Sequence, residues 1–508
     1  MTEKVQERRA RRAVLAIAAA KLAIHLVYSG GYGYFRDEFY YLACGERLAF
    51  GYVDHPPAIA VIAKVTRTVL GESPVALRLP AALAGAATIV IAASIARALG
   101  GRLFAQVLAA TCVLVAPHYL GTDGVLSMNA FEPLTWGAVA LLVVRTVEDD
   151  APRRLLWLGP VVGVGLLDKH SMSWVVAAIV LGLLLTPQRR LLRHREVWIA
   201  AAIAALIAAP NVIWEARHGW PTLEFARNAQ EHKNAILTPL AFLRSVFEGL
   251  HPFTAPVWIA GLYALTFGAR LRRHRALGLA FFAILALLLF QRGKPGYLMP
   301  IFPWLFAAGG VALERVIAAG WARAAVTTTL IAGGCATAPF VLAVLPIDAY
   351  QRYASALGVP GGSSEERHEA GPLPQHYADR FGWPELSAAV ARAVETLSPD
   401  ERAVAAIFAN NYGEASSIEF FGRALGLPRV ICGHNAWFTW GPGSPPPQII
   451  VAVGPDRQDL EAAFEDVRAG AEFDHPLSMP YERHLTIWVC RRPRAPLDQV
   501  WPQVKHYD

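Results

Sequence analysis

The sequence predicts a polytopic α-helical membrane protein with a C-terminal extracytoplasmic α/β domain. Three observations support this prediction. Of the 508 residues, 54% are hydrophobic and only 17% are charged, whereas soluble proteins carry roughly 25% charged residues. Long apolar runs fill residues 1–346, and arginine gathers in every second loop between them. From residue 347 to 508 the chain becomes polar and rich in glycine and proline, which indicates a separate water-soluble domain.

The apolar runs predict the membrane-spanning helices. A hydrocarbon core about 30 Å thick needs roughly 20 apolar residues per helix, and fewer where neighbouring helices shield it. About eleven runs meet this condition, near residues 13–30, 76–98, 103–119, 129–147, 155–168, 173–187, 197–214, 254–269, 276–291, 297–314 and 323–346. The runs 155–168 and 173–187 are short and could instead form one broken or re-entrant pair.

The distribution of arginine predicts the orientation in the membrane. Cytoplasmic loops are enriched in Lys and Arg. A cytoplasmic N-terminus places the arginine-rich loops on one side, with Arg97 and Arg102, Arg145, Arg153 and Arg154, Arg189, Arg190, Arg193 and Arg195, and Arg270, Arg272, Arg273 and Arg275. The opposite loops are longer and mixed in sign. An odd number of spans then puts the C-terminal domain outside.

The C-terminal region has the alternation expected of a small α/β layer. The apolar runs VAAIFA and IIVAVG predict buried strands. The stretches PELSAAVARAVETL and DLEAAFEDVRAG predict helices between them. The formal charge of +7 could suggest nucleic acid, but the arginines lie in short clusters that topology explains better. The five cysteines show no CxxC spacing, so neither a thiolate metal site nor a disulfide framework is indicated.

The ionisable residues near span ends all fall on the outer side. A charged group at the bilayer centre costs roughly 2.5 kcal/mol or more, so such residues are functional candidates. The first outer loop, YFRDEFYYLACGERLAFGYVDHPPAIAVI, is long, aromatic and amphipathic, and we expect it to lie in the membrane interface with its carboxylates facing a cavity. Alternatively, Asp37 and Glu38 only cap a helix in a solvated loop.

These residues resemble the polyprenyl-phosphate-sugar-dependent GT-C-type glycosyltransferases, the group of protein O-mannosyltransferases and of the lipid A aminoarabinose transferase. The resemblance spans most of the chain. Its most specific features are the Asp37–Glu38 pair that opens the first outer loop and the Asp54-His55-Pro56-Pro57 step that closes it. The segments NVIWEARHGWPTLEFARNAQEHK and GKPGYLMPIFPWL add weaker similarity.

The resemblance implies an enzyme that moves a monosaccharide from a polyprenyl-phosphate donor to an acceptor hydroxyl with inversion, on the outer face of a bacterial plasma membrane. It implies Asp37 as the base that takes the acceptor proton, with Glu38 beside it for positioning. Cationic groups are needed where the lipid phosphate departs. We expect substrate contacts from Lys294, Arg227, His55, Tyr40 and Tyr297. The resemblance further implies a possible divalent metal on Asp54 and His232, either zinc or manganese.

The sequence also departs from the family pattern. Tyr40 and His55 stand where the related lipid A transferases have Arg and Lys, so the phosphate contacts must differ. Glu132 lies inside an apolar run, where an idle carboxylate would be costly, and we expect it to act as a second acid; a simple interhelical hydrogen bond is the alternative. Asp168 and Lys169 are expected only to pair with each other.

The partners expected are the lipid-linked sugar, membrane lipids and a glycan, lipid or protein acceptor, without nucleic acid. A transporter or flippase of the lipid-linked sugar is the alternative function. The one-sided placement of the acidic residues disfavours it, and so does the absence of an internal repeat.

Overall fold

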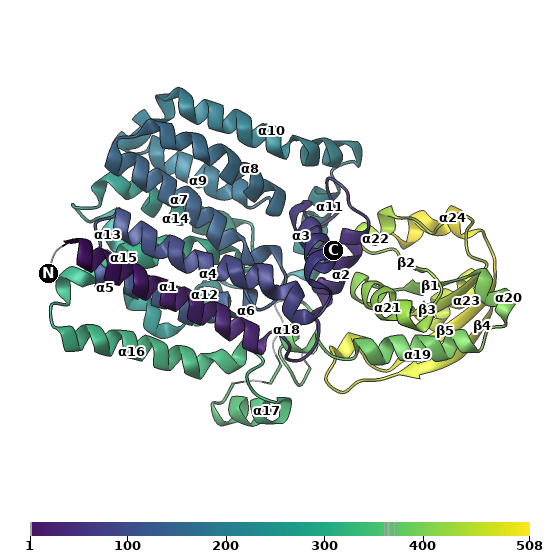
Figure 1. The fold of residues 1–508 in the computed structure, drawn as a ribbon. Helices are drawn as coiled ribbons and strands as arrows, with labels where there is room; N and C mark the ends of the chain where they lie inside the picture. The colour runs from purple at the N-terminus through teal and green to yellow at the C-terminus, as the bar shows by residue number, and fades with distance from the viewer. Residues whose placement is uncertain (1–2, 360, 363–365, 370) are drawn as a thin grey trace. The chain divides into compact units, whose positions relative to one another are not determined.

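The computed structural model describes residues 3–359, 361–362, 366–369 and 371–508. They form two compact units (Figure 1). The first comprises 1–31, 69–214 and 236–350, and the second comprises 32–68, 215–235 and 351–508. The predicted first outer loop and the segment after residue 214 therefore belong to the same unit as the C-terminal region.

The first unit is a bundle of helices. Its α-helices are α1 (Glu3–Tyr28), α4 (Pro74–Ala98), α5 (Leu103–Val115), α6 (Pro117–Thr122), α7 (Glu132–Asp149), α8 (Leu158–Asp168), α9 (Met172–Leu184), α10 (Arg195–Arg217), α12 (Pro239–Gly249), α13 (Ala255–Thr266), α14 (Arg275–Phe290), α15 (Phe302–Val316) and α16 (Gly320–Thr337), and α17 (Ile347–Ala356) begins at its end. The short turns are η1 (Met128–Ala130), η2 (Pro152–Trp157), η3 (Pro187–Arg193), η5 (Pro252–Thr254), η6 (Arg272–His274), η7 (Pro295–Ile301) and η8 (Ala338–Phe340). Each of the apolar runs identified in the sequence overlaps at least one of these helices. Several runs overlap two elements; among them, 103–119 overlaps α5 and α6, 297–314 overlaps η7 and α15, and 323–346 overlaps α16 and η8.

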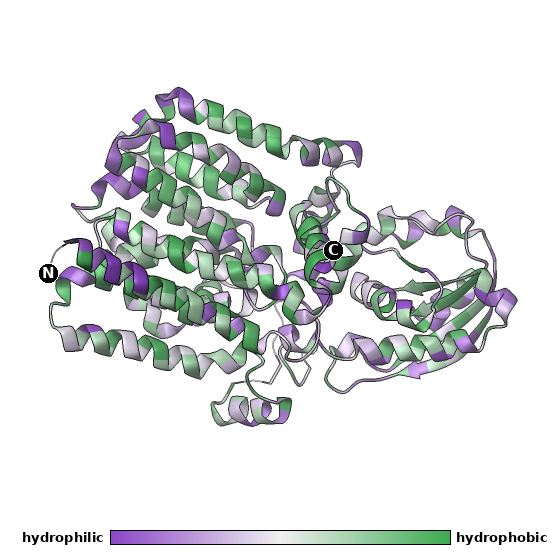
Figure 2. Cartoon of the chain, in the orientation of Figure 1, coloured by the Kyte–Doolittle hydropathy of each residue, from purple (hydrophilic) through white to green (hydrophobic). Residues whose placement is uncertain are grey.

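Five helical segments among the described residues are long and apolar enough to cross a membrane, or six if one bent pair counts as a span. They are Pro74–Ala98, Met128–Asp149, Arg195–Arg217, Arg272–Phe290 and Pro295–Val316, with the bent pair Met172–Leu184 and Pro187–Arg193. The green ribbons of Figure 2 follow these apolar stretches. Several other helices, such as α5 and α13, have only 12 or 13 residues. The count of eleven spans therefore stays a prediction.

Small residues let the central helices of this bundle approach closely. A Cβ added to Gly309 of α15 would lie 1.9 Å from the Val257 carbonyl oxygen of α13, and one on Gly261 of α13 would lie 2.0 Å from the Leu305 carbonyl oxygen. Close backbone contact through glycine is a usual way for helices to associate where lipid offers no hydrophobic driving force. Trp304, Leu305 and their neighbours on α15 are almost fully buried as a result.

A buried ion pair joins α1 to the turn after α6. Lys21 Nζ lies 2.6 Å from Asp123 Oδ2, and both side chains are almost completely shielded from solvent. Lys21 also donates to the Tyr119 carbonyl oxygen over 3.3 Å. Gly85 of α4 leaves the space for this pair, since a Cβ there would lie 2.2 Å from Asp123 Oδ2. Each charge thus depends on the other for compensation.

The second unit contains a five-stranded sheet with the order β2-β1-β3-β5-β4. Strands β1 (Ala405–Ala409), β2 (Val430–Cys432) and β3 (Ile449–Val453) are parallel, and the hairpin of β4 (Phe464–Phe473) and β5 (Leu485–Pro493) adds antiparallel to β3. The remaining elements are α2 (Arg36–Glu46), α3 (Ala58–Leu70), α11 (Pro221–Asn228), η4 (Ala229–Lys233), α18 (Gln375–Ala378), α19 (Trp383–Glu395), α20 (Pro399–Ala403), α21 (Tyr412–Leu425), α22 (Ala436–Thr439), α23 (Arg457–Ala463), η9 (Pro480–Glu482), α24 (Leu497–Val500) and η10 (Trp501–Val504).

Two layers cover this sheet. Helices α19 and α21 pack against each other and against the strands. On the opposite face, Leu460 of α23 and Trp501 of η10 join Ala406, Ile450 and Cys490 in one hydrophobic cluster. Helix α2 packs against α21, which ties the predicted first outer loop to the C-terminal fold.

The strands predicted from VAAIFA and IIVAVG are confirmed as β1 and β3, and the helix predicted from PELSAAVARAVETL is α19. The helix predicted over DLEAAFEDVRAG is wrong beyond Ala463, because β4 begins at Phe464. Phe464 and Phe473 are buried at the two ends of β4, and pairing with β5 overrides the helical preference of its Glu and Ala residues.

We expect Lys21→Met to lower the stability of the helical bundle by roughly 3–5 kcal/mol, because it leaves Asp123 buried without a partner. The thermal unfolding midpoint of the full-length chain in detergent measures this loss. The double variant Lys21→Met/Asp123→Asn removes both charges and should recover part of it. Lys64→Met, which breaks only an exposed pair with Glu46, is the control. An equal effect of Lys21→Met and Lys64→Met would contradict the dependence on burial.

Candidate functional site

Helix α2 carries the carboxylate pair that the sequence singles out. The Glu38 carboxylate accepts a hydrogen bond from the Phe35 main-chain N–H over 2.8 Å, which caps the start of the helix. Glu38 is completely buried, whereas the Asp37 side chain stays 27% exposed. The capping alternative therefore describes Glu38, and Asp37 is the carboxylate of the pair that solvent reaches.

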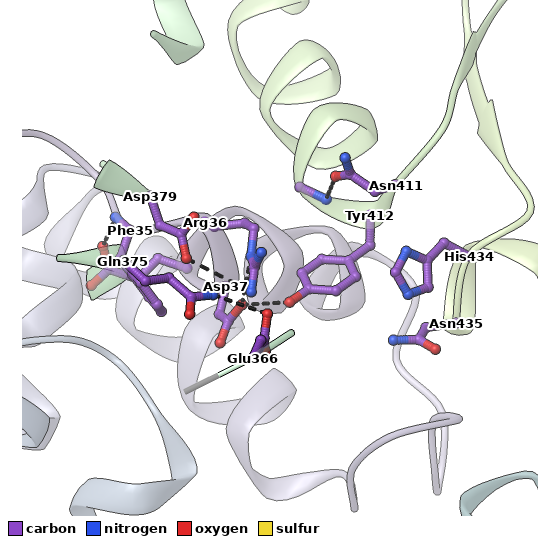
Figure 3. A network of polar contacts seen from close by, with 12 residues as sticks. Phe35, Arg36, Asp37, Glu366, Gln375, Asp379, Asn411, Tyr412, His434 and Asn435 are labelled. Atoms are coloured by element: carbon purple, nitrogen blue, oxygen red, sulfur yellow. Dashed lines mark hydrogen bonds and ion pairs between the residues drawn. The ribbon is translucent and has the colours of Figure 1, made fainter. Parts of the chain in front are cut away.

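Asp37 is held by two groups of its own unit (Figure 3). The Tyr412 hydroxyl donates to Asp37 Oδ1 over 2.8 Å, and Arg36 Nε lies 3.6 Å from the same oxygen. The Arg36 guanidinium also lies 5.3 Å from the centre of the Tyr412 ring. Both the Tyr412 hydroxyl and Arg36 Nε thus contact the same carboxylate oxygen of Asp37, Oδ1.

The start of α21 fixes Tyr412. The Asn411 side-chain oxygen accepts hydrogen bonds of 2.9 Å from the N–H groups of Gly413 and Glu414, which makes Asn411 a strong N-cap. Gly413 provides room for Arg36, because a Cβ there would lie 2.5 Å from Arg36 Cγ. The cap and the glycine together place the Tyr412 ring beside Arg36 and its hydroxyl at Asp37.

Arg36 also joins a buried polar network. Its Nη1 donates to the Tyr481 hydroxyl over 2.7 Å, and its Nη2 lies 3.8 Å from Asp379 Oδ2. The pKa of Asp379 is raised to about 7, with burial as the largest cause. Arg36 opposes this rise in the pKa, and the nearby Asp37, Glu366 and Glu482 add to it. Both Asp379 carboxylate oxygens are buried and accept no hydrogen bond among the described atoms.

The buried Tyr40 and His55 form a cluster with the half-buried Asp54 next to Tyr412. The Tyr40 hydroxyl donates to Asp54 Oδ1 over 2.7 Å and accepts from the Ala436 N–H over 3.2 Å. The His55 ring is completely buried, with Nδ1 2.8 Å from the Pro56 carbonyl oxygen and Nε2 3.7 Å from Cys44 Sγ. The Tyr40 and Tyr412 ring centres are 4.8 Å apart. In this structure Tyr40 and His55 serve the packing of the loop, and their contacts to substrate stay predictions.

The metal expected on Asp54 and His232 gains no support from the geometry. Asp54 already accepts the Tyr40 hydrogen bond, and His232 lies exposed on η4. Among the described residues, the one group of three His, Cys or acidic side chains close enough to share an ion contains neither of them. No chemical step is assigned to a metal at these two residues.

Arg227, which was predicted to contact the substrate, is exposed on α11, and a residue that binds the phosphate group of a substrate must be accessible in this way.

The first unit holds a second polar cluster around Lys169. Lys169 Nζ lies 2.7 Å from Glu132 Oε2 and donates to Asn129 Oδ1 over 2.6 Å. Ser171 donates to the other Glu132 oxygen. Lys169 also lies 4.5 Å from the centre of the Tyr297 ring. Glu132 and Tyr297, both predicted from the sequence, thus meet through a lysine that was expected only to pair with Asp168.

The predicted residues therefore fall into two groups. Asp37, Glu38, Tyr40, Asp54, His55, Arg227 and His232 belong to the second unit, and Glu132, Lys294 and Tyr297 belong to the first. Lys294 is partly exposed at the start of η7. The sequence singled out neither Tyr412 nor Asp379. The run FANNYGEASSIEFF, which contains Tyr412, showed only a composition that suits sugar binding or an ordinary turn.

The raised pKa of Asp379 predicts a pH dependence of stability. A carboxyl whose pKa is about 7 when folded and about 3.9 when unfolded binds its proton more tightly in the folded chain. Its stabilising contribution is complete below pH 4 and is lost as the pH rises to 7. We expect hydrogen exchange in 375–395, corrected for intrinsic rates, to accelerate between pH 5 and pH 8. Asp379→Asn should flatten this dependence, whereas Asp459→Asn, at an exposed residue of α23, should preserve it. An unchanged slope in Asp379→Asn would contradict the assignment.

Comparisons with known proteins agree with this architecture. A family model described as dolichyl-phosphate-mannose-protein mannosyltransferase matches residues 54–214. The chain is 29% identical over 205 residues to the lipid A galacturonosyltransferase RgtD of Rhizobium johnstonii, a match that covers 38% of this chain. The matched region spans 41% of the length of that curated relative.

Two crystal structures of ArnT from Cupriavidus metallidurans share the fold. The structure bound to undecaprenyl phosphate aligns with a TM-score of 0.63 at 16% identity, over 94% of this chain and 97% of that one. The apo structure aligns with a TM-score of 0.61 at 17% identity, over 95% and 98%. At this identity the likeness establishes the fold. Together, the family model, the relative and the two structures confirm the resemblance to GT-C-type glycosyltransferases that the sequence motifs indicated.

Proposed function

We propose that this chain is a glycosyltransferase that moves a monosaccharide from a polyprenyl-phosphate donor to an acceptor hydroxyl. The observation that carries the proposal is Asp37, which is the part-exposed carboxylate of the motif pair and is oriented by Tyr412 and Arg36. A base for a hydroxyl proton must be reachable and fixed in direction, and Asp37 meets both conditions. The likeness of the fold to that of ArnT also supports the proposal of a glycosyltransferase.

The reaction follows from this arrangement. The acceptor oxygen attacks the anomeric carbon from the face opposite the phosphate, and Asp37 takes its proton. The bond from the anomeric carbon to the phosphate oxygen breaks, and its electron pair leaves with the polyprenyl phosphate. Attack from the opposite face inverts the anomeric configuration. Developing charge on the phosphate needs cationic partners, for which we propose Lys294 and the exposed Arg227.

The relative RgtD acts on lipid A, by its name a galacturonosyltransferase. We therefore propose a lipid headgroup of this kind as the first acceptor to test, with galacturonic acid as the first sugar. The reaction is proposed for the outer face of a bacterial plasma membrane, with the second unit outside. We also propose that eleven helices span the membrane and that the membrane domain ends near residue 346.

We expect Asp37→Asn to lower the rate of transfer by about 10²–10⁴-fold, the usual contribution of a general base. The full-length chain in nanodiscs is supplied with polyprenyl-phosphate galacturonic acid and lipid A, and mass spectrometry counts the sugar added to the acceptor. Asp400→Asn, an exposed carboxylate of α20, is the matched control. Wild-type turnover by Asp37→Asn would refute the assignment of the base, and movement of donor across the bilayer without transfer would favour a flippase.

Tyr412 is proposed as the positioning residue for Asp37. Tyr412→Phe keeps the ring and removes the hydroxyl that donates to Asp37. A hydrogen bond to a charged group contributes roughly 1.5–3 kcal/mol, so we expect kcat to fall about tenfold or more. KM for the donor should stay within twofold. Tyr263→Phe removes the same atom from an exposed position of α13 and should leave both constants unchanged. A raised KM with unchanged kcat would contradict the positioning role.

A further inference from the structure

Three side chains of metal-ligand type meet in the second unit, and none of them belongs to the residues predicted to bind a metal. His434 follows β2, and His506 and Asp508 follow η10. One ligand atom from each of the three lies within 4.8 Å of the other two. His434 Nε2 is 3.1 Å from Asp508 Oδ1, and the rings of His434 and His506 are 4.4 Å apart. Figure 3 shows His434 beside Tyr412.

The main chain holds these residues in register. His434 and His506 form a parallel β-bridge, with Asn435 N–H donating to the His506 carbonyl over 3.0 Å and His506 N–H donating to the Gly433 carbonyl over 3.1 Å. A Cβ on Gly433 would lie 1.9 Å from the Val504 carbonyl oxygen, so the close approach requires glycine. The ligand-type side chains are therefore brought together by the backbone rather than by chance rotamers.

The hydrogen bonds around the imidazoles leave lone pairs for a ligand. His506 Nδ1 lies 3.0 Å from the Val504 carbonyl oxygen, which accepts only, so Nδ1 carries the proton and Nε2 is free to bind a metal. Metal-binding histidines usually donate their other N–H in this way. His434 Nε2 lies 3.0 Å from the Asp508 main-chain oxygen and 3.1 Å from Asp508 Oδ1, so an ion bound by Nε2 would replace the proton that faces these oxygens. His434 Nδ1 is buried without a hydrogen-bond partner among the described atoms, and it would carry the proton when Nε2 binds the ion.

The charges of the cluster also suit a cation. The two histidines supply imidazole nitrogens, and Asp508 supplies carboxylate oxygens. Lys233 is the nearby positive charge that acts on both residues, and its Nζ lies 3.8 Å from the carboxylate of Glu366. That ion pair offsets part of the repulsion that Lys233 would exert on a metal ion.

We propose that His434, His506 and Asp508 bind a divalent zinc-type ion that fastens residues 504–508 to the end of β2. Two imidazoles and one carboxylate form a usual three-residue zinc set, with a fourth position left for water. Ligand bonds of about 2.0–2.1 Å in a tetrahedron place ligand atoms about 3.3 Å apart, close to the observed 3.1 Å between His434 Nε2 and Asp508 Oδ1. This proposal does not depend on the proposed glycosyltransferase activity.

Zinc binding by the full-length chain tests the proposal. The protein is purified in detergent through a tag without histidine, treated with EDTA, and titrated with Zn²⁺ against a chromophoric chelator. We expect one zinc per chain by elemental analysis, and at least tenfold weaker binding in His506→Ala and in Asp508→Asn. Zinc should slow hydrogen exchange in 500–508 of the wild type and leave exchange in these two variants unchanged.

Two controls make the result decisive. His484→Asn removes an exposed histidine of the same unit and should bind zinc like the wild type; Asn also tolerates the positive φ of that position. Unfolding midpoints measured in EDTA must match between variants and wild type, which separates lost binding from misfolding. Failure of the wild type to bind zinc would overturn the proposal, as would loss of binding in Asp54→Asn or His232→Ala but not in His506→Ala.

Discussion

The hydrogen bond from Tyr412 to Asp37 joins two parts of the chain that lie 375 residues apart, and the geometry of the proposed base depends on it. It is part of a wider requirement for compensating buried charge. Arg36 is nearly buried and contacts Asp37, Asp379 and Tyr481, so its positive charge meets carboxylates and a hydroxyl oxygen. A buried guanidinium without such partners would be strongly destabilising. The network therefore fixes α2 against α21 and leaves one edge of Asp37 to solvent.

The first unit satisfies the same requirement with simpler pairs. Lys21 meets Asp123, and Lys169 meets Glu132, each within an apolar helical environment. A lysine between Glu132, Asn129 and the Tyr297 ring is held in one direction by three different contacts. Glu132 therefore has a positioning partner in this structure, and its expected role as a second acid stays a prediction.

The sequence predicted the helices well and the pairing of side chains poorly. Apolar runs locate helices because burial in a bilayer needs a long hydrophobic stretch, and β1 and β3 were found for the same reason in a buried sheet. Asp37 was singled out as a candidate because a motif marks it locally. Tyr412 was not found, since nothing in FANNYGEASSIEFF shows that its ring meets residue 37 after folding. Lys169 was assigned to its sequence neighbour Asp168, but α8 ends at Asp168 and the lysine turns toward Glu132 instead.

The second unit is assembled from three separate stretches of the chain, 32–68, 215–235 and 351–508. A ribosome synthesises Asp37 long before it reaches Tyr412, so the carboxylate has no Tyr412 hydroxyl to orient it during most of translation. The sheet cannot form until β5 at Leu485–Pro493 has emerged. A nascent chain interrupted before that point contains every apolar helix but lacks the completed fold around Asp37. The contact that orients Asp37 is therefore completed only after β5 has been synthesised, when all helices of the first unit have already emerged.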